Sequence, residues 1–193
     1  MTTFIDRNPQ RSFQLGFQDE TEDYFIPVDV AHALPIADTE HMRFMEGKSF
    51  ETAIKATVNN GANYDVLIRI PSTLQYAHLF GYFYVTTSAP CDTFLFEGTS
   101  VSNNGTTFAT FNKNRMSDTT ALTLLSHTPT ITNTGVQIEY DLLHGSKQDG
   151  GSFKNFLGHM ILKGDTNYPT RLTNNSTGVA TIAFSIHWYE IRT

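Results

Sequence analysis

Residues 179–191 have the sequence Val-Ala-Thr-Ile-Ala-Phe-Ser-Ile-His-Trp-Tyr-Glu-Ile. Apolar side chains recur here at every second position, which is the period of a β-strand. One face of this strand is predicted to lie in a core, because it carries only apolar residues: Ala180, Ile182, Phe184, Ile186 and Trp188. A strand this apolar would invite pairing with other chains at a sheet edge, so we expect it to be paired inside a sheet.

The same period recurs upstream. We predict further strands at residues 49–58, 64–70, 76–88, 92–97, 106–113, 120–126, 135–143 and 156–163. The separating segments, such as 59–63 and 102–105, are rich in Asn and Gly, which are turn residues. No segment shows the 3.6-residue period of a helix over twelve positions. Short strands at this spacing favour a sandwich or barrel over an α/β fold, so we predict an all-β protein with a single antiparallel β-sandwich over residues 41–193.

The first forty residues follow a different pattern. Pro9, Pro27 and Pro35 interrupt any continuous helix or central strand, and an acidic stretch at 18–23 separates short apolar groups. We predict an extended N-terminal arm over residues 1–40. Ordering such an arm requires a surface and backbone hydrogen-bond partners, and strand addition to a neighbouring chain supplies both. The expected assembly contacts are its apolar residues Phe4, Ile5, Phe13, Leu15, Phe17, Tyr24 and Phe25.

Composition excludes several classes of protein. The 193 residues contain one cysteine, Cys91, so a disulfide framework is ruled out. The formal net charge of −6 argues against a nucleic-acid partner. No apolar run approaches the roughly 20 residues of a membrane span, so no membrane partner is expected. The N-terminus lacks a basic segment followed by an apolar stretch, so we expect no signal peptide and synthesis in the cytoplasm.

Catalytic motifs are missing from the sequence. Gly47-Lys48-Ser49 ends like a phosphate-binding loop, but Met42 stands where that motif needs its first glycine, and a strand follows. The seven histidines have no local metal-ligand spacing, and we expect His78 and His187 to be hydrogen-bonded sheet residues. We therefore predict no catalytic residue, no cofactor and no metal site.

Carboxylates that a glycoside hydrolase could use lie in or beside predicted strands, and their separation in space would decide such a role. For each, a solvated position or an ion pair, such as one between Glu97 and Arg115, is the simpler interpretation. The residues are Asp92, Glu97, Glu139, Asp141 and Glu190.

Aromatic residues in two predicted strands offer another kind of site. Exposed rings on a β-sandwich can stack against sugars, whereas buried rings only pack. The candidate residues for a glycan platform are Tyr82, Tyr84, Trp188 and Tyr189.

Several short segments of the sequence, taken in order, resemble segments of one protein family. They occupy residues 46–51, 65–71, 76–78, 95–99, 112–115, 162–168 and 188–190. The chain resembles the β-sandwich virion proteins of tailed bacteriophages, especially head decoration or cement proteins. The likeness spans roughly residues 41–193 and includes no catalytic signature.

The resemblance implies a jelly-roll-like sandwich with a structural role. Such proteins form oligomers on the outside of the capsid and bridge its subunits. The implied partners are the major capsid protein and copies of the chain itself, as a homotrimer or else a homodimer. The implied location is the outer surface of the virion. A receptor- or glycan-binding module of a tail or fibre is an alternative, and a glycoside hydrolase is another.

Overall fold

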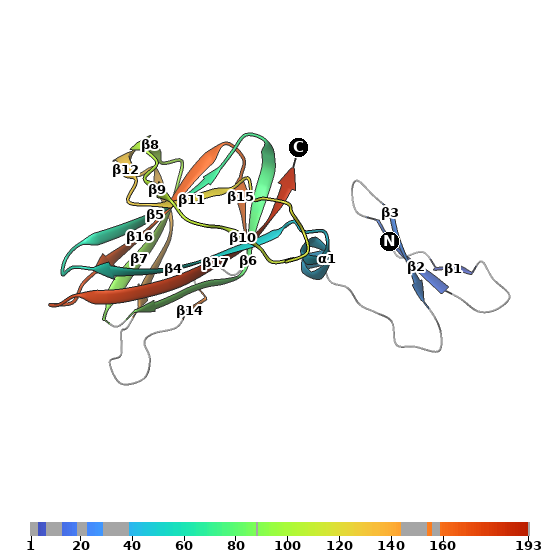
Figure 1. Ribbon diagram of the computed structural model, residues 1–193, viewed down its shortest axis with the longest axis horizontal. Helices are drawn as coiled ribbons and strands as arrows, with labels where there is room; N and C mark the ends of the chain where they lie inside the picture. The colour runs from blue at the N-terminus through green and yellow to red at the C-terminus, as the bar shows by residue number, and fades with distance from the viewer. Residues whose placement is uncertain are drawn as a thin grey trace. The chain divides into compact units, whose positions relative to one another are not determined.

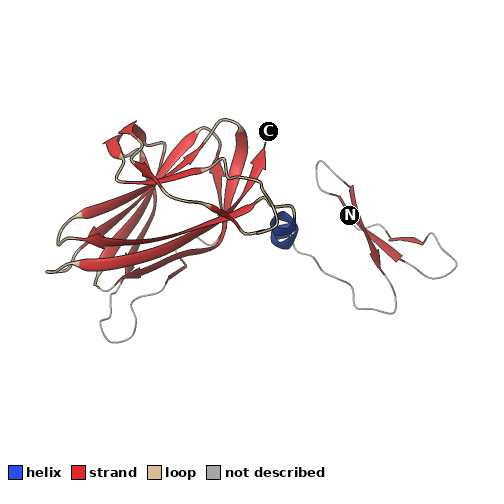
Figure 2. Cartoon of the chain, in the orientation of Figure 1, coloured by secondary structure: helices blue, strands red, loops and turns tan. Residues whose placement is uncertain are grey.

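The computed structural model describes residues 4–6, 13–18, 23–28, 39–87, 89–143, 154–155 and 159–192. The chain divides into two compact units, Met1–Thr39 and Glu40–Thr193. Strand dominates the described part of the chain (Figure 2). No described helix is long and apolar enough to cross a membrane.

Of the twelve described strands in the two large sheets of the second unit, eight are the longer ones. They are β4 (Ser49–Val58), β5 (Asn63–Ile70), β6 (Leu74–Thr87), β7 (Cys91–Glu97), β13 (Val136–Leu143), β15 (His159–Lys163), β16 (Thr166–Asn174) and β17 (Ala180–Arg192). Shorter elements join them: α1 (Thr39–Met45), β8 (Ser100–Asn103), β9 (Thr106–Thr107), β10 (Phe111–Asn112), β11 (Leu124–His127), β12 (Thr130–Asn133) and β14 (Lys154–Asn155).

The strand order is that of a jelly roll. One sheet runs β10-β4-β17-β6-β14, with β15 also paired to β6, and the other runs β13-β7-β16-β5-β11-β9, all antiparallel. Successive long strands cross between the sheets, except that β7 and β13 pair within one sheet. Figure 1 shows the two layers, with β5, β16 and β7 in one and β4 and β17 in the other. The prediction of an all-β antiparallel sandwich is confirmed.

Strand β17 lies where its sequence predicts. It pairs with β4 on one side and β6 on the other. Its even positions from Ala180 to Trp188 are buried, and Trp188 is 0% exposed. Trp188 pairs with Phe50 of β4, and the two ring centroids are 5.9 Å apart. The apolar face of β17 is therefore the centre of the core, as predicted. Strand β6 also has partners on both sides, so it is a central strand of its sheet.

The segment between β7 and β13 differs from its prediction. The strand expected at 106–113 is two short strands in different sheets, because β10 pairs with β4 whereas β9 pairs with β11. The strand expected at 120–126 is β11, shifted to Leu124–His127. Strands β8 and β12 form a separate two-stranded sheet, which the sequence analysis missed together with α1.

The long strand β16 was also missed, although it lies between β5 and β7. Its sequence contains Pro169, which argues against a central strand. Its pairing with β5 covers Thr166–Thr173, whereas its pairing with β7 covers only Thr170–Asn174. Pro169 therefore lies where β16 has a partner on one side only, and this is the kind of position where a strand tolerates proline.

The first unit contains a three-stranded antiparallel sheet in the order β1-β2-β3. Its strands are β1 (Phe4–Asp6), β2 (Phe13–Gln18) and β3 (Asp23–Val28). The strands of the predicted arm are thus extended, but they pair with one another.

Candidate functional site

The predicted assembly contacts occupy both faces of the N-terminal sheet. Directly paired positions of neighbouring strands lie on one face, and the register pairs Phe4 with Leu15 and Leu15 with Ile26. Ile5 and Phe25 hold positions of the opposite face. Ile26 and Val28 were not among the predicted assembly contacts, although the alternation from Tyr24 places them on the same face as Tyr24. One face thus holds the positions of Phe4, Phe13, Leu15, Phe17, Tyr24, Ile26 and Val28, with Asp6 at its end, and we call these seven apolar positions the N-terminal apolar face.

Charge is divided very unequally between the two units. Met1–Thr39 contains seven acidic residues against two Lys or Arg, a formal charge of −5. Glu40–Thr193 contains twelve acidic residues against eleven Lys or Arg, a formal charge of −1. The N-terminal sheet is therefore part of an acidic unit, and the jelly roll is close to neutral.

The prediction of a glycan platform is wrong for Trp188 and Tyr189, the two of its four residues whose side chains are described. Trp188 is 0% exposed and Tyr189 is 8% exposed, so neither ring can stack on a sugar. Both pack instead: Trp188 against Phe50, and Tyr189 against Phe80 with centroids 5.6 Å apart. Tyr82 and Tyr84 lie in β6, and their side chains are outside the described residues.

The constellation most like a catalytic site lies on the outer face of the sheet that contains β17. Nε2 of His187 is 2.8 Å from Oγ of Ser185 and 3.9 Å from Oε2 of Glu51. Nδ1 of His187 is 3.3 Å from Nζ of Lys113. Burial, and secondly the charge of Lys113, lowers the pKa of His187 against the opposing effect of Glu51.

These contacts set the protonation of His187 in a way that opposes catalysis. A lysine ammonium has only donors, so Nδ1 must accept and the ring proton lies on Nε2. Nε2–H then donates to Ser185. A serine nucleophile needs the reverse, a histidine nitrogen that takes its proton. His187 is therefore a hydrogen-bonded sheet residue, as predicted. His78 is another, because its Nδ1 bonds the Tyr189 hydroxyl.

Three of the strand carboxylates have partners on other segments, and Asp141 accepts from the N–H of Leu142 at 2.9 Å. Asp92 accepts from the Tyr140 hydroxyl at 3.1 Å. Glu97 pairs with Lys163 at 2.5 Å, so the expected pair with Arg115 is wrong. Arg115 instead lies over the Phe111 ring at 5.7 Å, because the 110–121 segment turns back on itself near β10.

Glu190 is the third, and it is only 1% exposed. Its carboxylate accepts from the backbone N–H groups of Leu122 at 3.0 Å and Thr123 at 2.7 Å, and from Nε1 of Trp188 at 3.2 Å. These donors satisfy a buried charge that would otherwise be costly. Glu190 therefore fixes the 122–123 segment against β17.

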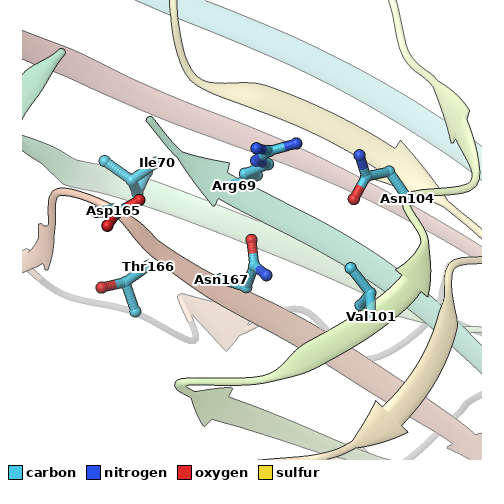
Figure 3. A pocket seen from close by; sticks show the side chains of 7 residues that line it. All are labelled: Arg69, Ile70, Val101, Asn104, Asp165, Thr166 and Asn167. Carbon is cyan, nitrogen blue, oxygen red and sulfur yellow. The ribbon is translucent and has the colours of Figure 1, made fainter. Parts of the chain in front are cut away.

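A polar hollow of about 260 Å³ lies where the β8 segment covers β5 and β16. Arg69 and Asn167 hold directly paired positions, and Nδ2 of Asn167 donates to the Thr99 carbonyl at 3.0 Å. Figure 3 shows both side chains facing Asn104 and Val101 across the hollow. Ligand pockets are mostly apolar with a few polar groups. This hollow is polar, so it lacks the apolar walls of such a site.

A second hollow of about 250 Å³ lies beside the 110–121 segment. Two side-chain amides that line this hollow form hydrogen bonds that hold the 110–121 segment in place. Nδ2 of Asn112 donates to the carbonyls of Gly47 and Thr119, at 2.7 and 2.9 Å, and Nδ2 of Asn114 donates to the Met45 carbonyl at 2.9 Å. The Nδ2 donors of these two asparagines thus hold the segment in place.

The remaining motifs are structural. Gly47 is a turn residue with φ +69° that leads into β4, where Ser49 is buried, which agrees with the prediction that a strand and not a phosphate-binding loop follows. Cys91 is a free thiol, 1% exposed, at the start of β7. Within the described ranges, no three His, Cys, Asp or Glu side chains gather as a metal site would require.

An exposed apolar surface on β13 and β7 was not expected from the sequence. Ile138, Tyr140 and Leu142 of β13 are 40%, 52% and 41% exposed. Phe94 and Phe96 of β7 lie beside them and are partly buried. We call these five residues the apolar stripe. The sequence analysis predicted a strand at 135–143 but did not assign its faces, and the apolar face of β13 is the exposed one.

Compared with models of known protein families the chain matches none, and no curated protein is similar to it in sequence. The argument for function therefore depends on the two units and their surfaces.

Proposed function

We propose that the protein is a structural virion protein, a decoration or cement protein that binds the outer surface of an assembled bacteriophage head. In this proposal it has no catalytic activity. The observation that carries it is the N-terminal sheet, a separate unit that brings seven apolar positions onto one face. The jelly roll adds support, since this architecture recurs in viral capsid and lectin domains, although a fold alone does not assign a function.

A single sheet must bury its apolar face against a second layer. Chains shorter than roughly 40 residues usually need a disulfide, a metal or an oligomer to fold, and Met1–Thr39 is just below this length. A capsid surface supplies the missing layer. Because the sheet binds the assembled lattice and not its separate subunits, binding stabilises the lattice by mass action.

The charge of the N-terminal unit specifies the partner surface further. A unit with a formal charge of −5 and an apolar face is complementary to an apolar surface with a basic rim. Such binding weakens as salt screens the charges. Several copies in one oligomer present several N-terminal sheets, so multivalency raises the avidity for a repeating lattice.

The test is binding of the full-length protein to capsids that lack it, by co-sedimentation and by the temperature of capsid disruption. We expect binding, a higher disruption temperature and weaker binding at high salt. Failure to bind under any ionic condition would remove the proposal.

Two variants of β2 locate the contact. Leu15→Asp changes the N-terminal apolar face, whereas Gln14→Asp adds the same charge at a position of the opposite face. We expect Leu15→Asp to weaken binding at least about tenfold, since a buried apolar side chain contributes about 1.5–3 kcal/mol. Gln14→Asp is expected to bind nearly as the native chain does. Equal binding of both variants would contradict the proposed contact.

A further inference from the structure

Three residues of the apolar stripe lie on β13, which is an edge strand among the described strands and ends the order β13-β7-β16-β5-β11-β9. Its exposure contrasts with the outer face of β4, which presents Glu51, Ala53, Lys55 and Thr57. Edge strands in soluble proteins usually carry charged or polar outward residues, because an apolar edge promotes association. An edge strand with three exposed apolar side chains in a row is therefore a marker of an interface.

The stripe is held in one arrangement by contacts within the chain. The ring of Phe94 lies 6.1 Å from that of Phe96 and 5.2 Å from that of Tyr140, centroid to centroid. The Tyr140 hydroxyl is fixed by Asp92. Arg171 lies over Phe96 at 5.9 Å. A surface that is already ordered loses little side-chain entropy on binding, and Tyr, Phe and Arg are enriched at interfaces.

Two charged groups around the stripe are paired with opposite charges on the same chain, whereas Asp92, opposite Leu142, accepts a hydrogen bond from the neutral Tyr140 hydroxyl. Arg171 forms two hydrogen bonds with Asp65, at 2.7 and 3.0 Å. Glu97, beside Phe96, pairs with Lys163. The whole unit Glu40–Thr193 has a formal charge of only −1. A nearly neutral, apolar surface lacks the excess positive charge that an acidic partner such as nucleic acid would need, but it suits a surface of its own kind.

We propose that the apolar stripe is a self-association surface, on which the stripes of two copies of the jelly roll pack against each other. Such a contact is isologous, because the same patch serves both subunits, and it closes as a dimer. The dimer was the second of the two oligomers that the resemblance implied. This inference is independent of capsid binding, which a separate measurement tests.

The test is sedimentation velocity of the full-length protein from about 1 µM to about 300 µM, a range that covers weak interfaces of modest area. We expect the native chain to change from monomer to dimer across this range. Leu142→Asp is expected to raise the dissociation constant at least about tenfold by burying an unpaired charge.

Ile161→Asp is the matched control. Ile161 is 62% exposed, lies in β15 of the other sheet and receives the same substitution, so it should dimerise as the native chain does. Circular dichroism checks that both variants are folded. A native chain that stays monomeric, or a Leu142→Asp variant that dimerises as strongly as the native chain, would overturn the proposal.

Disulfide trapping provides a second readout that does not depend on a loss of binding. Cys91 is buried, so a cysteine introduced by Tyr140→Cys would be the accessible thiol among the described residues. Stripe-on-stripe packing brings two copies of position 140 close together, and oxidation should yield a covalent dimer. Ile161→Cys should yield none. Association without a Tyr140→Cys disulfide would mean that another surface, such as the N-terminal unit, joins the copies, and it would refute this packing.

Discussion

The two units of the chain differ in how their apolar faces are covered. In Glu40–Thr193, the inward positions of β17 and β4 are covered by the second sheet, and Trp188 and Phe50 are almost completely buried. In Met1–Thr39, the described strands form one sheet, so the N-terminal apolar face has no second layer from another described strand of its own unit. Two packed layers make a stable domain. The jelly roll is therefore expected to be stable by itself, and the N-terminal sheet to gain stability from a partner.

The comparison predicts where substitutions change folding. The largest effect should come from Trp188→Ala, which removes the largest fully buried side chain of the core. We expect a loss of about 3–5 kcal/mol in the free energy of unfolding, measured by urea denaturation. Thr181→Ala, at an exposed position of the same strand, should change it by less than about 0.5 kcal/mol. A small effect of Trp188→Ala would mean that the jelly roll lacks the core described above.

Glu190→Gln should have the next largest effect. The carboxylate accepts from three N–H donors, and an amide of the same shape would replace one acceptor oxygen with a donor. We expect a loss of about 2–3 kcal/mol in the same denaturation experiment. Glu97→Gln, in the exposed pair with Lys163, should cost no more than about 1 kcal/mol. Equal losses in the two variants would argue against the buried role of Glu190.

The stability of the jelly roll should also fall in mild acid because of His187. Its pKa is lowered in the folded protein, whereas the unfolded chain takes up a proton at the ordinary value near 6.5. Above pH 6.5 both states are neutral at this residue, so it contributes no pH dependence. As the pH falls below 6.5, the unfolded state binds more protons and stability decreases, until the folded pKa is passed. His187→Gln should flatten the pH profile of the unfolding free energy in this window, and an unchanged slope would contradict this origin.

The smallest effect on folding should come from the N-terminal sheet. Leu15→Asp is expected to change the unfolding free energy of the jelly roll by less than about 0.5 kcal/mol, because the described core residues of the jelly roll belong to Glu40–Thr193. Urea denaturation followed by Trp188 fluorescence reports on the jelly roll alone, since Trp188 is the single tryptophan. A large loss would show that the two units depend on each other for stability. It would contradict the expectation that the jelly roll is stable by itself.

The sequence predicted the elements in which local pattern and burial agree. Strands β4 and β17 were found because their alternation coincides with a covered face. Strand β16 contains Pro169, and proline argues against a strand that is paired on both sides. At Pro169 itself β16 is paired on one side only, and a sequence pattern does not reveal this. The 110–121 segment depends on the amides of Asn112 and Asn114 bonding to residues far along the chain, which no local pattern encodes.

The surfaces were harder to predict than the elements. Alternation shows which residues share a face, but the partner layer decides which face is covered. On β17 the apolar face is inside, and Trp188 is buried. On β13 the apolar residues Tyr140 and Leu142 face outward, while Glu139 lies opposite the fully buried Leu95. The sequence thus predicted the position of β13 in the chain, but it did not show that the apolar face of β13 is exposed.

Hydrogen exchange of the full-length protein, free and bound to capsids that lack it, tests the central claim most directly. The account predicts that backbone amides of β2 and β3 gain protection on the capsid, because the N-terminal sheet acquires its second layer there. Amides of β17, which are already paired on both sides, should exchange equally in both samples. Equal exchange of the β2 and β3 amides with and without capsids would contradict the account.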